Sequence, residues 1–165
     1  MKNMTINEFA KIVASDSPVP GGGSIAALCG ALSAALTEMV ANLTVGKKKY
    51  ADSKEEMTDI INKATVLRDR LLNYIEEDSL AYNKVMEAYK LPKETEEEKS
   101  LRLSKIEEGL KIAASVPLKV AETSFEILPL AEAVVQRGNS NSVTDALVGA
   151  MMARTGVLSA VLNIR

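Results

Sequence analysis

Pro18-Val19-Pro20-Gly21-Gly22-Gly23-Ser24 opens the longest apolar segment of the chain, residues 25–45. The prolines stiffen the backbone and the glycines can take positive φ at no steric cost, so the motif predicts a tight turn. The segment that follows holds a single charge and no proline. It predicts a long helix that starts near Ser24, with the Ser24 hydroxyl as a candidate N-cap, and ends at Gly46.

A glycine-rich turn before a helix can serve two purposes. Its unpaired N–H groups form an anion site beside the positive end of the helix dipole. Alternatively, it lets a helix of small residues pack closely on its neighbours. The turn lacks both the GxGxxG spacing and the GK[ST] ending of nucleotide-binding loops, so taken alone it favours packing.

Composition restricts the classes of function. A length of 165 residues predicts one domain, residues 1–165, and a net charge of −2 with 4% aromatic residues and no Trp argues against a nucleic-acid partner. The single cysteine, Cys29, cannot form an internal disulfide and is expected to be a small core residue. With no signal pattern at the N-terminus, a cytoplasmic location is expected.

The chain contains no histidine, which limits its chemistry. Ser–His and Cys–His couples are excluded, and no metal site is expected. Proton transfer would have to use Asp, Glu, Lys, Tyr or water.

Residues 25–45 also have the length of a transmembrane helix and are followed by Lys47, Lys48 and Lys49. Glu38, Asn42 and the excess of alanine over leucine and isoleucine argue against insertion. A helix buried in a soluble bundle is the better interpretation, with no membrane partner.

Helical periodicity extends through the rest of the chain, and no strand-like alternation of useful length occurs. Capping boxes predict helix starts at Thr5, Ser53, Thr95 and Ser142. Pro117 and Pro129 are expected to kink or divide the stretch 96–136 into two or three pieces. The predicted fold is therefore an all-α bundle of five to six helices with a long alanine-rich central helix.

The helix over residues 24–45 has two different faces. One carries large apolar residues, at positions 25, 28, 32, 36, 39 and 43, and the other carries small ones, at positions 27, 30, 31, 34, 35 and 41. The small-residue surface can approach another helix or a ligand closely. Because such a surface is normally covered, a homodimer is expected.

Asp78 interrupts the predicted core stripe of the helix over residues 53–89. It lies three residues after Ile75 and four before Tyr82, where an apolar side chain is expected. A carboxylate on such a face is paired, faces a pocket or has a raised pKa. Both a structural ion pair and general acid–base catalysis therefore remain open for Asp78.

Three other groups of polar residues have similar alternatives. The lysines at 47–49 either complement the helix dipole or dock a carboxylate of a substrate. Glu38 either forms a surface or interface contact or projects into a site. Asn139, Asn141 and Asp145 are explained by turns and caps, although their side chains could also line a pocket.

The motifs together resemble the cyclodeaminase/cyclohydrolase family of tetrahydrofolate enzymes, including the C-terminal domain of formiminotransferase-cyclodeaminase. The matching segments appear in the family's order over nearly the whole length: PVPGGGSIAALCGALSAALTEMVANLT (18–44), GKKKY (46–50), EEDSLAYNKVMEAYKLPK (76–93), EEEKSLR (96–102), AASVPLKVAE (113–122) and GNSNSVTDA (138–146). The resemblance implies an all-helical protein, dimeric or higher, that acts on a tetrahydrofolate derivative as a standalone module without a metal.

The resemblance implies one of two reactions. In cyclodeamination, a folate nitrogen attacks the formimino carbon and ammonia leaves, which gives methenyltetrahydrofolate. In cyclohydrolysis, water adds to the methenyl carbon and the ring opens to formyltetrahydrofolate. Both move protons around a tetrahedral carbon, and the sequence does not choose between them. The lack of a fused formiminotransferase domain leans slightly towards cyclohydrolysis.

On this resemblance, Asp78 is expected to be the catalytic proton-transfer residue. The residues expected to bind the folate, including a polyglutamate tail at the lysines, are Gly21, Gly22, Gly23, Ser24, Lys47, Lys48, Tyr82, Asn139, Asn141 and Asp145. The alternative from another class is a non-catalytic helical dimerisation or scaffold module, which would not need a carboxylate at Asp78.

Overall fold

The computed structural model describes residues 1 and 3–164. Its five α-helices and two short 3-10 helices are α1 (Ile6–Val13), α2 (Gly22–Val45), η1 (Lys48–Ser53), α3 (Lys54–Tyr89), α4 (Glu96–Arg137), η2 (Ser140–Ser142) and α5 (Val143–Val161). The described part of the chain contains no strand. The prediction of an all-α fold is confirmed.

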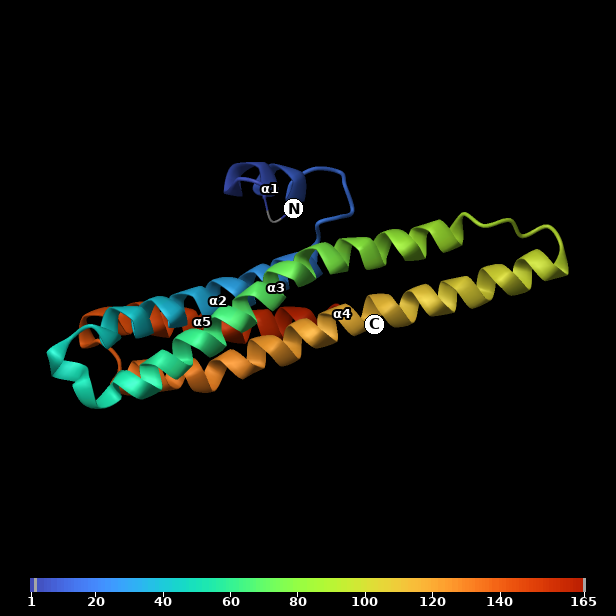
Figure 1. The fold of residues 1–165 in the computed structure, drawn as a ribbon. Helices are drawn as coiled ribbons and strands as arrows, with labels where there is room; N and C mark the ends of the chain where they lie inside the picture. Colours follow the sequence, from blue (N-terminus) through green and yellow to red (C-terminus); the bar gives the residue numbers. More distant parts are fainter. Residues whose placement is uncertain (2, 165) are drawn as a thin grey trace.

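Helices α2, α3, α4 and α5 form an elongated bundle, and α1 lies apart from its axis (Figure 1). Both α3 and α4 extend beyond the ends of α2 and α5, and we call this two-helix extension the arm (Figure 1). Helix α5 runs antiparallel to α2, because Asn139 contacts Thr44 at one end and Asn163 lies beside Gly22 at the other. Both ends of this α2–α5 pair therefore bring together residues distant in sequence.

The small-residue face of α2 is covered by the same chain. Ala27, Ala31 and Ala34 are at most 2% exposed, in a core shared with α3, α4 and α5. The larger residues Leu32 and Leu43 are 46% and 43% exposed. The homodimer was expected because the alanine surface must be covered, and that reason is wrong: helices of the same chain cover it. The small residues let these helices approach closely, while Leu32 and Leu43 remain outside the core.

Two of the four predicted capping boxes form. At Thr5 and Thr95 the side chain accepts the N3 backbone N–H, and the N3 glutamate returns a bond to the cap residue. Ser53 and Ser142 make no side-chain cap bond. Each is the last residue of a 3-10 helix and has ψ near 0°, so neither has the extended backbone that an N-cap hydroxyl needs.

Helix α4 continues unbroken through Pro117 and Pro129, so the predicted division of this stretch is wrong. Each proline removes one backbone donor, and packing of α4 on α3 and α5 keeps the helix intact on both sides. Near the C-terminal end of α3, Met86 and Tyr89 are 38% and 46% exposed, because only α4 accompanies α3 in the arm (Figure 1).

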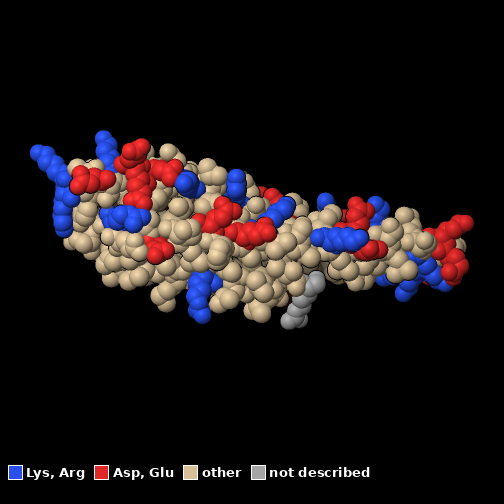
Figure 2. Space-filling model, turned by 90° about the horizontal axis from the view of Figure 1, so that it is seen from below, with Lys and Arg blue, Asp and Glu red and all other residues tan. Residues whose placement is uncertain are grey.

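Figure 2 shows acidic and basic side chains interspersed on one face of the molecule, with uncharged areas between them. By length and composition alone, α2 is apolar enough to cross a membrane. More than half of the most apolar part of α2 is buried inside the bundle, as in the core helix of a soluble protein.

Candidate active site

The carboxyl group of Asp78 lies against the first turn of α2. Ser24 donates its hydroxyl hydrogen to Asp78 Oδ2 over 2.8 Å, and its oxygen also lies 3.4 Å from the Ile75 carbonyl. Ser24 is fully buried within α2, and the N-cap is Gly21. The prediction that Ser24 caps α2 is therefore wrong: its hydroxyl joins α2 to α3 instead.

Gly23 makes this contact possible. A Cβ atom at this position would overlap the Asp78 carboxyl group, whose carbon would be only 2.7 Å away. No glycine of the described residues has a positive φ, so the expectation that the glycines of the turn adopt this conformation is wrong. Gly23 instead leaves room for a side chain of the neighbouring helix.

Burial raises the pKa of the Asp78 carboxyl above its ordinary value, and hydrogen bonds from the Ser24 side chain and backbone offset part of the rise. The positive end of the α2 dipole also faces this carboxyl group. Asp78 therefore occupies the position at the N-terminus of α2 where a bound anion would otherwise lie. The group is partly buried, so a ligand can still exchange a proton with it.

Asn163 lies beside the glycine turn, with its side-chain oxygen 3.4 Å from a Cβ placed on Gly22. Its amide donates to the Ser159 carbonyl over 2.8 Å. Tyr82 follows Asp78 by one turn of α3 and is partly buried. We call Gly21–Ser24, Asp78, Tyr82 and Asn163 the aspartate end; Asn163 was not predicted, because nothing in the sequence signals that α5 returns to this turn.

A second polar group lies at the opposite end of α2. The Asn139 N–H donates to Thr44 Oγ1 over 2.8 Å, and the Asn139 side chain accepts from the Asn141 N–H over 3.2 Å. Asn139 is 4% exposed, so its main observed role is to fasten the loop after α4 to α2. Asp145 lies in the first turn of α5.

Tyr50 connects the lysine segment to the same loop. Its hydroxyl oxygen accepts the Ser140 N–H over 3.0 Å and lies 3.0 Å from Ser140 Oγ. The Lys49 ammonium lies 5.2 Å from the Tyr50 ring centre. We call Lys47–Tyr50 with Asn139–Asp145 the lysine end. Tyr50 was not among the predicted site residues, although it closes the GKKKY motif.

The aspartate and lysine ends are far apart within one chain. Twenty residues of α2 separate Ser24 from Thr44, a rise of about 30 Å. The structure therefore brings Gly21–Ser24 together with Asp78, and Lys47–Lys49 near Asn139–Asp145. It does not bring the two groups into a single pocket of one chain.

Other predicted residues have structural partners. Glu38 forms a 2.5 Å ion pair with Arg68 of α3 and is 17% exposed. Its contact is therefore with another helix of the same chain, which neither the expected surface or interface contact nor the expected site role describes. Cys29 is partly buried and burial raises the pKa of its thiol, which agrees with an unreactive packing residue. Within the described residues, no three acidic or cysteine side chains are grouped as metal ligands would be.

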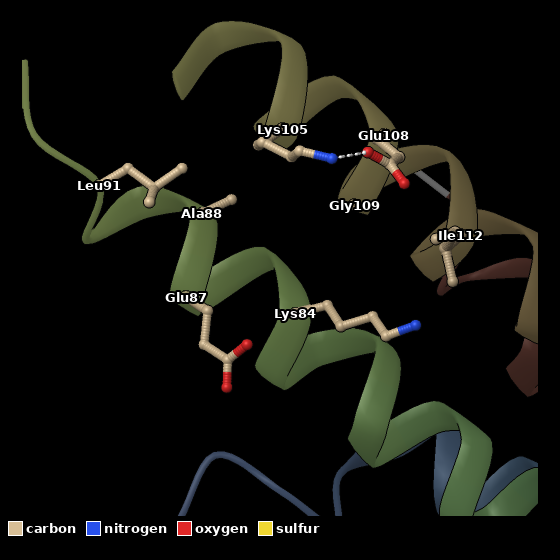
Figure 3. Close-up of a pocket in the computed structure, with 8 residues that line it drawn as sticks. All are labelled: Lys84, Glu87, Ala88, Leu91, Lys105, Glu108, Gly109 and Ile112. Carbon is tan, nitrogen blue, oxygen red and sulfur yellow. Dashed lines mark hydrogen bonds and ion pairs between the residues drawn. The ribbon is translucent and has the colours of Figure 1, made fainter. Parts of the chain in front are cut away.

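A surface hollow of about 280 Å³ lies between the two helices of the arm (Figure 3). Its lining includes Lys84 and Glu87 of α3 and Lys105 and Glu108 of α4, and the last two form a 2.8 Å ion pair with each other (Figure 3). None of the predicted site residues lines this hollow. The arrangement at Asp78 remains the better candidate for catalysis.

These features define an all-helical protein whose candidate catalytic group is a partly buried carboxyl held at a helix N-terminus. The sequence profile described as formiminotransferase-cyclodeaminase matches residues 5–165. The chain therefore belongs to the formiminotransferase-cyclodeaminase family.

Individual relatives agree with this assignment. The chain is 45% identical to a methenyltetrahydrofolate cyclohydrolase of Methylorubrum extorquens, over 98% of this chain and 78% of that protein. It is 35% identical to mouse formimidoyltransferase-cyclodeaminase, over 97% of this chain but only 30% of the mouse protein. The crystal structure of a formiminotetrahydrofolate cyclodeaminase from Thermotoga maritima superposes with a TM-score of 0.87 at 32% identity, covering 99% of this chain and 77% of that one.

Proposed function

We propose that this protein is a folate one-carbon enzyme that forms or opens the methenyl ring of tetrahydrofolate. Relatives at 45% and 35% identity carry the names of the two reactions, and each alignment covers nearly the whole of this chain. The observation that carries the mechanism is the Asp78 carboxyl, held by Ser24 at the glycine turn.

Both reactions need a group that exchanges protons with a tetrahedral carbon flanked by nitrogens. A carboxyl whose pKa is raised by burial retains its proton closer to neutral pH than an exposed one. We assign Asp78 the proton that goes to the departing amine in cyclodeamination. In cyclohydrolysis the same group, ionised, accepts a proton from the attacking water.

The reaction is tested by following the absorbance of the methenyl compound from both directions. Formation from formiminotetrahydrofolate would identify a cyclodeaminase. Decay of methenyltetrahydrofolate above the uncatalysed rate would identify a cyclohydrolase, which the 45% identical relative favours. If neither signal occurs and folate causes no thermal shift, the protein is a helical scaffold and the proposal is wrong.

We further propose that the enzyme is a homodimer whose pocket is shared between two chains. Leu32 and Leu43 of α2 and Leu147, Met151 and Leu158 of α5 are 43–69% exposed. The aspartate and lysine ends lie at opposite ends of this same helix pair. A twofold axis across its middle would place the aspartate end of one chain against the lysine end of the other.

In this shared pocket, the residues around Asp78 would hold the reacting part of the folate, and Lys47 and Lys48 would meet its glutamate tail. The contacts around Gly23 and Asp78 support the first assignment. Lysine ammonium groups favour the second, because a polyglutamate tail adds a carboxylate with every residue. We also propose that the protein is soluble and cytoplasmic and that its reaction does not use a metal.

A further inference from the structure

Tyr50 differs from an ordinary surface tyrosine in how its hydroxyl is held. The Ser140 N–H can only donate, and it donates to Tyr50 Oη over 3.0 Å. Ser140 Oγ lies at the same distance from Tyr50 Oη and can donate a second hydrogen bond. When Ser140 donates both bonds, the phenol proton is left free to point towards a ligand.

The surroundings of Tyr50 also favour its ionised form. The Ser140 side chain and backbone, with a smaller effect of Lys49, lower the pKa of Tyr50 to about 8. Near neutral pH such a phenol can both give and take a proton. The other charged residues on η1 and at the starts of the helices beside it are Lys47, Lys48, Asp52, Lys54, Glu55, Glu56 and Asp145.

Each of the proposed reactions needs at least two proton transfers. In cyclodeamination of the protonated formimino group, the attacking nitrogen bonds to the formimino carbon and loses one proton, while the π electrons of the carbon–nitrogen double bond move onto the formimino nitrogen. The carbon–nitrogen bond to the amine then breaks, its electron pair stays on that nitrogen, and the nitrogen gains one proton before it leaves as ammonia. In cyclohydrolysis, the attacking water bonds to the methenyl carbon and loses one proton. The bond from that carbon to one ring nitrogen then breaks, its electron pair stays on the nitrogen, and the nitrogen gains one proton. The remaining hydroxyl proton is released to solvent as the formyl carbonyl forms. Asp78 accounts for one transfer in each case.

We infer that Tyr50 is the second catalytic proton-transfer residue, with Ser140 as its positioning residue. In cyclodeamination the phenolate takes the proton from the attacking nitrogen, and in cyclohydrolysis the phenol gives its proton to the departing ring nitrogen. The inference rests on the proposed function, including the shared pocket, because Tyr50 and Asp78 of one chain lie at opposite ends of α2.

The experiment compares the purified full chain with Tyr50→Phe, Ser140→Ala and, as a control, Tyr89→Phe. Tyr89 lies at the tip of the arm, where Arg102 contacts its ring and backbone carbonyl, and phenylalanine keeps both contacts. First, tyrosinate absorbance is titrated. We expect a step near pH 8 that persists in Tyr89→Phe, disappears in Tyr50→Phe and moves to higher pH in Ser140→Ala.

Second, turnover is measured from pH 6 to 10 with the substrate that the wild-type protein accepts. Tyr50→Phe should lower kcat by roughly 10²-fold or more and remove the limb of the pH profile near 8. Ser140→Ala should keep most of the turnover but shift that limb upwards, in step with the absorbance titration. Circular dichroism shows whether each variant is folded.

Each result decides a different point. Normal turnover in folded Tyr50→Phe, or a limb that Ser140→Ala leaves in place, overturns the role of Tyr50 while the proposed function stands. A wild-type protein that converts neither folate substrate overturns the proposed function and, with it, this role.

Discussion

Gly23 leaves the space that the Asp78 carboxyl group occupies. The two residues belong to different helices, and a Cβ on Gly23 would overlap the carboxyl oxygens. The contact fixes where Asp78 lies relative to the first turn of α2. It explains in physical terms why a glycine stands at a helical position that requires no positive φ.

The variant Gly23→Ala tests this contact. The added methyl group must push Asp78 away from Ser24, so we expect turnover to fall at least tenfold and the free energy of unfolding to drop by about 1–3 kcal/mol. Thermal unfolding and the methenyl absorbance assay measure both effects. Gly46→Ala is the control, because a Cβ there has no neighbour within 4 Å. Equal behaviour of the two variants would contradict the proposed role of Gly23.

Asp78→Asn tests the proton-transfer role. Asparagine retains the shape and can still accept the Ser24 hydrogen bond, but it cannot exchange a proton. We expect kcat to fall roughly 10²–10⁴-fold with the fold unchanged by circular dichroism. Glu77→Gln is the matched control. The Glu77 carboxylate is next to Asp78 in sequence but is exposed, and its ion pair with Lys119 is long, at 3.8 Å. Unchanged turnover in Asp78→Asn would remove Asp78 from the mechanism.

The raised pKa of Asp78 also predicts how stability depends on pH. The folded protein holds this proton to higher pH than the unfolded chain does, so the contribution of Asp78 is complete below its unfolded pKa. This contribution is lost as pH rises through the folded value. We therefore expect urea unfolding from pH 3 to 8 to show that the free energy of unfolding of wild type, relative to that of Asp78→Asn, decreases as pH rises. A difference that does not change with pH would contradict the raised pKa.

Local signals and tertiary contacts differ in how well the sequence predicts them. Thr5 and Thr95 cap their helices as predicted, because each box depends only on residues three apart. Ser53 and Ser142 have the same pattern but are the last residues of 3-10 helices, which the spacing of a capping box does not reveal. Pro117 and Pro129 were expected to kink or divide α4, and the division does not occur. The sequence did not reveal this, because the packing that holds the helix together is not local.

The candidate site follows the same division. Asp78 could be predicted because a charge interrupts a periodic apolar stripe. Its contact with Ser24 could not, because the two residues are 54 positions apart and meet only when α3 packs on α2. Similarly, Tyr50 and Ser140 are 90 positions apart, so the motif GKKKY alone gives no reason to single out its tyrosine.

The double variant Lys47→Ala/Lys48→Ala tests the proposed contact with a glutamate tail. Exposed ion pairs contribute about 0.2–1 kcal/mol each, so the loss of two lysines should raise KM for a polyglutamylated folate roughly 2- to 30-fold. KM for the monoglutamate should change much less, and added salt should reduce the difference. Lys99→Ala/Lys105→Ala on the arm is the control, since those lysines pair with Glu96 and Glu108. An equal loss for both folates would show that the lysines only complement the helix dipole.

Mixing two impaired variants tests whether the pocket is shared. In a mixed dimer of Asp78→Asn and Tyr50→Phe chains, one site carries both changes and the other carries neither. Random exchange makes half of the dimers mixed, so we expect turnover to recover to roughly a quarter of the wild-type value. Each variant alone stays impaired, and size-exclusion chromatography with light scattering reports the dimer. If both variants are impaired but the exchanged mixture recovers nothing, Asp78 and Tyr50 do not meet across an interface. Because they also lie at opposite ends of α2 within one chain, the shared pocket would then be wrong.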